Sequence, residues 1–88
     1  MDVTNAIDAA VRAADKAIAG DMQTLDGHPA AQHLERLRET LLAMRERGTV
    51  GADELRTVIR DVASWAPEDD VSLLGALGVI ARANARSG

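Results

Sequence analysis

The chain has 88 residues, of which 47% are hydrophobic and 27% are charged, and its formal net charge is −4. This length predicts a single domain, residues 1–88. The sequence contains a single tryptophan and no Cys, Phe or Tyr. This composition excludes disulfides, thiolate metal sites, cysteine nucleophiles and aromatic platforms for single-stranded nucleic acid.

The distribution of charge argues against targeting and membrane segments. Five of the first twenty residues are charged, which is not typical of a secretory signal peptide. The longest uncharged run near the C-terminus, residues 71–81, is shorter than the roughly 17–25 residues that cross a bilayer. No segment is basic enough to indicate a nucleic-acid footprint. We therefore expect a soluble cytoplasmic protein that binds neither membranes nor nucleic acid.

Composition also predicts the fold class. Seventeen residues are alanine, the best helix former, and the frequent Arg, Leu and Glu residues follow it closely. Val and Ile never alternate with polar residues over the length of a strand. The sequence therefore predicts an all-α fold, a small antiparallel four-helix bundle with helices at about 3–19, 29–47, 52–65 and 67–85.

The first predicted helix, 3–19, has a thin apolar face because alanine supplies much of it. Small side chains allow a neighbouring helix to approach closely. Asp8 and Arg12 stand four residues apart in the order that favours an ion pair within the helix. Gly20 is a typical residue at a helix end. The apolar face consists of Val3, Ile7, Ala10, Val11, Ala14 and Ile18.

A loop over residues 20–28, with a turn at Asp26-Gly27, precedes the second predicted helix, 29–47. Pro29 suits the first turn of this helix, where a backbone N–H is not needed. The apolar positions repeat at alternating spacings of four and three residues, a seam too short to predict a coiled coil. These positions are Ala30, Leu34, Leu37, Leu41 and Met44.

Gly48 ends the second helix, and the third predicted helix spans 52–65. Asp53 and Glu54 occupy its first turn, where the positive end of the helix dipole stabilises carboxylates. The helix stops before Pro67, because a residue that precedes proline disfavours the helical conformation. The apolar face consists of Leu55, Val58, Ile59, Val62 and either Trp65 or Ala66.

The fourth predicted helix, 67–85, begins with three carboxylates in its first turn and has Arg82 and Arg86 near its end. Apolar side chains surround it almost completely. This pattern predicts either the central helix of the bundle or a helix that also contacts a second subunit. Gly75 and Gly78 lie on nearly one side, and each costs up to about 1 kcal/mol of helix propensity. Close contact with another helix would offset that cost. The three carboxylates are Glu68, Asp69 and Asp70.

Of the two histidines, we interpret His28 as a residue at the start of the second helix and His33 as a surface or boundary residue. On one helix their side chains would diverge by roughly 140°, so they would not share a metal ion. A metal site also needs three or four ligands, and none cluster in this sequence. The carboxylates at 68–70 are interpreted as complements of the helix dipole. We therefore predict no metal and no cofactor.

Residues 48–55 resemble the second half of an EF-hand loop, with glycine at position six and Glu54 at position twelve. The resemblance implies a helix–loop–helix unit that binds calcium. Ala43, Arg45 and Arg47 stand at positions one, three and five, where calcium requires oxygen ligands. This departure removes calcium binding. A vestigial EF-hand and an ordinary junction between two helices remain as interpretations.

Residues 70–73, Asp-Val-Ser-Leu, resemble the Asp-Ser-Leu motif of acyl carrier proteins, which are small, acidic and four-helical. The resemblance implies that Ser72 carries a phosphopantetheine group. The sequence departs from the family in three ways. Val71 interrupts the motif, the serine lies late in the chain, and the following helix is apolar rather than acidic. These departures argue against phosphopantetheine attachment at Ser72.

Two interpretations stay open for Trp65. It continues an apolar stripe typical of a core, and tryptophan is also a residue type enriched at protein interfaces.

Because no catalytic motif is present, we expect a non-enzymatic protein–protein interaction module that binds a protein partner, a second copy of itself, or both. One alternative is an acidic inhibitor, of the phage or mobile-element type, of a nucleic-acid-binding machine. Another is a carrier-like or EF-hand-like domain. The candidate interface residues are Trp65, Val71, Leu74, Gly75, Gly78 and Val79.

Overall fold

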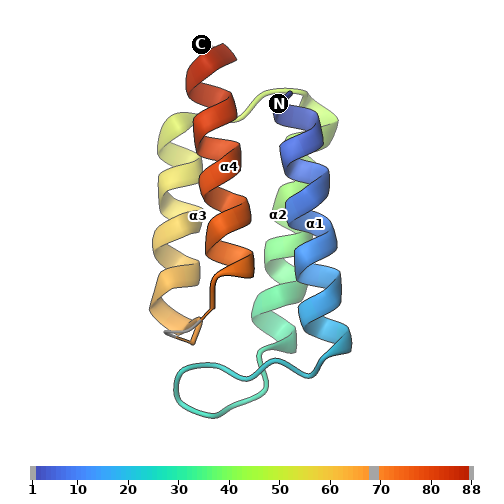
Figure 1. The fold of residues 1–88 in the computed structure, drawn as a ribbon, viewed down its shortest axis with the longest axis vertical. Coiled ribbons are helices and arrows are strands. Elements are labelled where there is room, and N and C mark those ends of the chain that lie inside the picture. The colour runs from blue at the N-terminus through green and yellow to red at the C-terminus, as the bar shows by residue number, and fades with distance from the viewer. Residues whose placement is uncertain (1, 68–69, 88) are drawn as a thin grey trace.

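The computed structural model describes residues 2–67 and 70–87. The four helices run alternately up and down along a bundle that measures 38 × 19 × 18 Å, and both termini lie at one end (Figure 1). This arrangement confirms the predicted all-α class and four-helix bundle. The helices are α1 (Val3–Ala19), α2 (Ala31–Arg47), α3 (Ala52–Trp65) and α4 (Ser72–Ser87).

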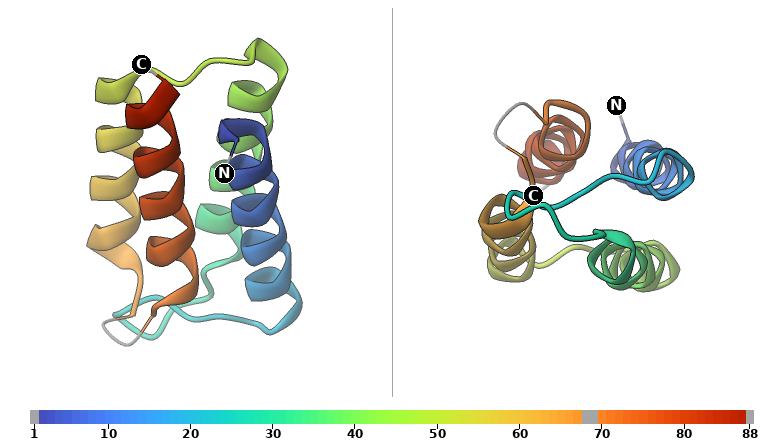
Figure 2. Two further views of the ribbon diagram at one scale, coloured as in Figure 1. Left: turned by 45° about the horizontal axis from the view of Figure 1, so that its top comes forward. Right: turned by 90° about the horizontal axis from the view of Figure 1, so that it is seen from below.

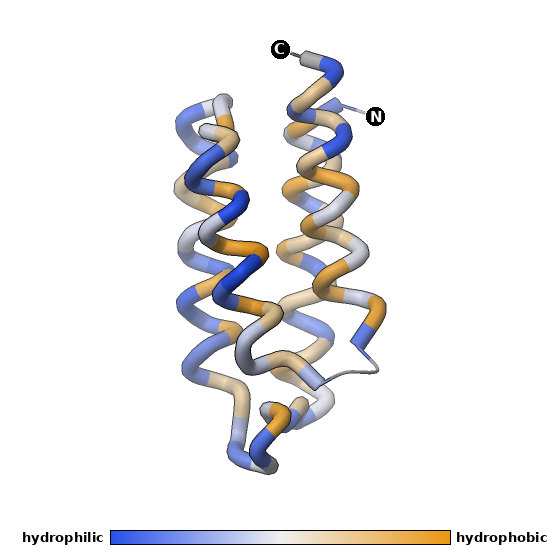
Figure 3. The backbone as a smooth tube through the Cα atoms, turned by 90° about the vertical axis from the view of Figure 1, so that its left-hand side faces the viewer, coloured by the Kyte–Doolittle hydropathy of each residue, from blue (hydrophilic) through white to orange (hydrophobic). Residues whose placement is uncertain are grey.

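Seen along the bundle axis, each helix occupies one corner of a square (Figure 2). Helix α1 packs against α2 and α4, and α4 also packs against α3. Helix α4 is therefore a corner helix and not the central helix that its composition allowed, because in a bundle of four every helix keeps one side toward solvent. Along most of its length α4 is apolar or neutral, whereas α2 and α3 carry many more hydrophilic residues (Figure 3).

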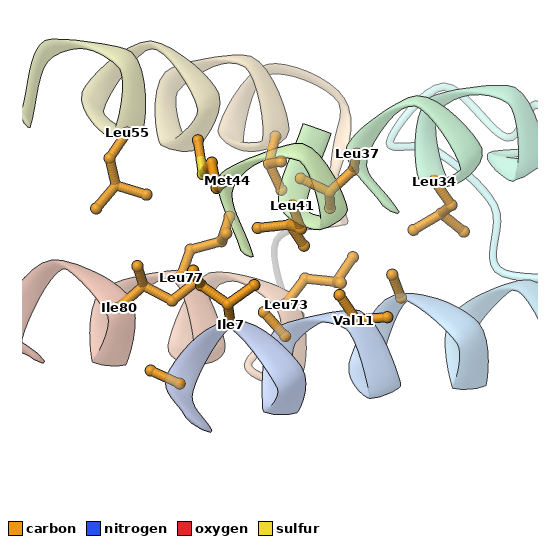
Figure 4. Close-up of a cluster of buried hydrophobic side chains, with 14 of the residues drawn as sticks. Ile7, Val11, Leu34, Leu37, Leu41, Met44, Leu55, Leu73, Leu77 and Ile80 are labelled. Carbon is orange, nitrogen blue, oxygen red and sulfur yellow. The ribbon is translucent and has the colours of Figure 1, made fainter. Parts of the chain in front are cut away.

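All four helices contribute their predicted apolar faces to one core, in which the side chains point toward one another (Figure 4). Ala6, Ala10 and Ala14 are buried as well, so α1 approaches its neighbours closely, as its alanine stripe predicted. Removing this apolar surface from water supplies the main driving force for folding. The largest fully buried side chains are Ile7, Leu34, Leu41, Met44, Val62, Leu73, Leu77 and Ile80.

Helix α2 begins at Ala31, slightly later than the sequence predicted. The reason is that residues of the connection before it form hydrogen bonds with one another. The backbone N–H of Ala30 donates to the carbonyl of Met22 at 3.0 Å. Gln23 and Pro29 form an isolated antiparallel bridge. These contacts keep the proline outside the helix.

The connection from α1 to α2 crosses beneath the end of the bundle and reaches α3 (Figure 1). The backbone N–H of Leu25 donates to the carbonyl of Trp65, the last residue of α3, at 2.8 Å. The turn predicted at Asp26-Gly27 is present, and Gly27 adopts a φ of 81° that suits glycine. The loop is therefore fixed to the end of α3.

Helix α4 begins at Ser72, later than the predicted start at Pro67. The carbonyl of Pro67 accepts the backbone N–H of Asp70 at 3.0 Å, and Asp70 and Val71 both precede the helix. The Asp70 carboxylate then accepts the N–H groups of Leu73 and Leu74, each at 3.4 Å. Asp70 thus lies before the helix and caps its first turn, whereas the sequence predicted Asp70 within that first turn. The two other carboxylates predicted in this turn lie outside the described residues: Glu68 and Asp69.

Ion pairs join neighbouring helices. The sequence predicted a pair between Asp8 and Arg12 within α1, and this prediction is wrong, because α2 packs along that flank of α1 and Asp8 binds Arg45 of α2 at 2.6 Å. Asp15 binds Arg38 of α2 at 2.7 Å. Arg12 makes no ion pair within the described residues. Exposed pairs of this kind contribute at most about 1 kcal/mol each, but they favour one orientation of α1 against α2.

Candidate interaction surface

One side of α4 faces away from the bundle, and we call it the outer face of α4: Val71, Gly75, Gly78 and Arg82. The spacing of four, three and four residues brings these positions to one side of a helix. Val71 is 81% exposed. Gly75 and Arg82 are exposed, and Gly78 is half-buried. Val71 precedes the helix by one residue, and its carbonyl accepts the N–H of Gly75 at 3.2 Å. An exposed apolar side chain therefore stands at the beginning of this face.

Neither glycine of the outer face is required by a contact within the described chain. Apart from its chain neighbours and the nearby backbone of α4 itself, a Cβ atom built on Gly75 or on Gly78 would meet no atom within 4 Å. Neither residue adopts the left-handed backbone conformation that favours glycine. The close helix contact that would offset their cost is therefore absent within the described residues. Leu74 and Val79 flank this face and are half-buried against the core.

Trp65 belongs to the core and not to the outer face of α4, because its side chain is only 6% exposed. Its ring stacks on that of His33 in α2, with centroids 4.9 Å apart and an interplanar angle of 16°. Its indole N–H donates to the Asp61 carboxylate at 3.4 Å. The stack joins α2 to α3. Of the predicted interface residues, Trp65 thus offers little surface to a partner.

The histidines do not converge. His33 lies on α2, whereas His28 lies in the connection before that helix, where its backbone N–H donates to Thr24 Oγ1 at 3.2 Å. Within the described residues, no group of three or more His, Cys, Asp or Glu side chains is arranged to hold a metal ion.

The segment that resembles an EF-hand forms a short junction. Helices α2 and α3 are joined by residues 48–51, where Gly48 adopts a left-handed φ of 75° and ends α2 as predicted. An EF-hand loop holds twelve residues. Here the arginines at positions three and five of the resemblance, Arg45 and Arg47, belong to α2. Arg47 forms an ion pair with Glu54, the residue at position twelve. This junction therefore has an arginine paired with the carboxylate that would bind calcium in the family.

A groove with a volume of about 590 Å³ lies between α1 and the beginning of α4. Ser72, the serine of the carrier-protein resemblance, is exposed and lines it. The other polar side chains of the groove are Arg12, Lys16 and Asp70. A second groove, of about 300 Å³, lies between α3 and the last turns of α4 and is mostly apolar. The two grooves border α4 on opposite flanks and at opposite ends.

Two groups of carboxylates differ in their surroundings. Those of the first group lie on α1 and α3 and pair with arginines: Asp8, Asp15, Asp53 and Glu54. Asp21, Asp26 and Asp70 lie in the two connections at one end of the bundle, and neither connection contains Lys or Arg. The same end holds Leu25, which is 55% exposed, and Val71. This end of the bundle is therefore acidic with exposed apolar side chains.

Comparison with protein families, with curated proteins and with solved structures found no match to this chain. Among the described helices, none combines the length and the apolar character that spanning a membrane requires. The surface features above are therefore the basis for inferring a function.

Proposed function

We propose that this chain is a non-enzymatic protein–protein interaction module, a regulator, adaptor or accessory subunit, and that the outer face of α4 is its binding surface. The observation that carries the proposal is the unfilled space beside Gly75 and Gly78 in an exposed helix. Each glycine costs about 1 kcal/mol relative to alanine. A partner helix that packs directly on the backbone at these glycines would offset that cost.

The side chains around the glycines support the same function. Burying Val71, which is 81% exposed, would contribute roughly 1.5 kcal/mol to binding. Leu74 and Val79 add partly exposed apolar surface on the two flanks. Recognition of one helix by the apolar face of another is a common mode of protein binding. We further infer a cytoplasmic location, because a sequence without cysteine fits a reducing compartment.

Affinity capture from lysate of the native host tests this function with three immobilised baits: the wild-type chain, Gly75→Gln, and Ala63→Gln as a matched control on an exposed position of α3. Glutamine is a good helix former and fits the free space at residue 75, so both variants should fold. We expect mass spectrometry to identify a protein, or the chain itself, that wild type and the control retain and Gly75→Gln loses. Equal retention by all three baits, or retention by none, would contradict the proposal.

A second candidate is an acidic inhibitor of a nucleic-acid-binding machine. The observation that favours it is the acidic end of the bundle, where Asp21 and Asp26 lie in a connection without Lys or Arg and beside the exposed Leu25. A basic partner would bind this end and not α4. In the same capture experiment, a basic protein retained by Gly75→Gln but lost by the double variant Asp21→Asn, Asp26→Asn would favour the inhibitor.

A further inference from the structure

We propose that the partner of the outer face of α4 is a second copy of this chain, packed antiparallel around a two-fold axis that passes between Gly75 and Gly78. This inference rests on the proposed function and names its partner. Most soluble oligomers are symmetric, and in a two-fold interface the same patch of each copy faces the other. The patch must therefore complement itself.

The order of charges along α4 complements itself only in the antiparallel orientation. Between Ser72 and Ser87 the helix contains no Asp or Glu, and its basic residues, Arg82 and Arg86, lie toward its C-terminal end. Asp70 stands immediately before its N-terminal end. In an antiparallel pair each arginine end lies beside the acidic end of the other copy. A parallel pair would bring the arginines of both copies together, and like charges repel.

The side chains also match across this axis. With Gly75 of one copy opposite Gly78 of the other, Val71 lies opposite Arg82, and Leu74 and Val79 line the two flanks of the contact. Each of these contacts occurs twice because of the symmetry. The two glycines let the backbones approach closely, and the aliphatic part of Arg82 covers the exposed Val71. The pairing therefore uses every exposed or half-buried residue of the predicted interface.

The helix dipoles favour the same pairing, because antiparallel helices place the positive end of one dipole beside the negative end of the other.

Disulfide trapping tests the pairing, because the wild-type chain contains no cysteine. Val71→Cys and Arg82→Cys chains are mixed in equal amounts, oxidised and separated without reductant. Val71 lies opposite Arg82 of the second copy but about 16 Å along the helix from Val71 of that copy. A disulfide requires Cα atoms within about 7 Å. We expect the mixed 71–82 disulfide to exceed the 71–71 disulfide at least tenfold.

The control is Ala63→Cys on the exposed side of α3, which should form no disulfide with Val71→Cys above background. A dominant 71–71 product would overturn the antiparallel orientation. A product no more abundant than that of the control, together with a monomeric mass of the wild-type chain, would overturn the second copy as partner. The proposed function would survive that result if another protein is captured by wild type and lost by Gly75→Gln, so the two failures are distinguishable.

Discussion

At the scale of single residues, the local structure requires glycine at one position of this chain and does not require it at another. Gly48 ends α2 with a φ of 75°, a left-handed conformation that costs other residues about 1–2 kcal/mol. Its own backbone therefore requires it. Gly75 lies in regular helix with free space beside it, so neither its backbone nor a neighbour in the described chain requires it. We propose that glycine at this position serves a contact with another molecule.

The same substitution at these two positions should therefore change stability in opposite directions. We expect Gly48→Ala to lower the free energy of unfolding by about 1–2 kcal/mol. Gly75→Ala should raise it by up to about 1 kcal/mol, because alanine is the better helix former. Urea unfolding followed by circular dichroism, at a protein concentration low enough to keep the chain monomeric, measures both. A loss of stability in both variants would mean that Gly75 has a structural role within the chain.

At the scale of elements, helix periodicity could be predicted better than helix beginnings. Regular spacing of apolar residues identified four helices and most of the core, because burial imposes that spacing. The starts of α2 and α4 were predicted too early. Both depend on hydrogen bonds between residues of a connection, such as that from Ala30 to Met22, which proline positions alone do not reveal. Of the candidate interface residues, Trp65 lies in the core, and the sequence alone allowed both places because a lone tryptophan on an apolar stripe occurs in cores and in interfaces.

The cap of α4 gives a prediction at this scale. The Asp70 carboxylate accepts two backbone N–H groups that have no partner within the helix, so Asp70→Ala should lower the free energy of unfolding by about 1 kcal/mol. Asp70→Asn should retain most of the stability, because its side-chain oxygen still accepts. Asp26→Ala, which removes an exposed loop carboxylate, is the control. Urea unfolding of the three variants measures these differences, and equal stability of Asp70→Ala and the control would argue against the cap.

At the scale of the whole molecule, the bundle leaves one of its most apolar helices at a corner. A chain of this length buries only about two thirds of the surface that its unfolded form exposes, so some apolar helix surface stays outside the core. Here that surface includes Val71 at the beginning of α4 and the half-buried Leu74 and Val79. Asp70 precedes α4, Arg82 and Arg86 lie toward its C-terminal end, and the glycines lie between. These features together are the basis on which we propose the outer face of α4 as a binding surface for another chain.

Sedimentation of wild type and Gly75→Gln over a range of concentrations tests the central claim most directly. The account predicts that the wild-type mass rises from 9.3 kDa toward twice that value as concentration increases. Gly75→Gln should remain monomeric over the same range, although its unfolding temperature is higher. Association of Gly75→Gln as strong as that of wild type would contradict the claim that the outer face of α4 is the binding surface.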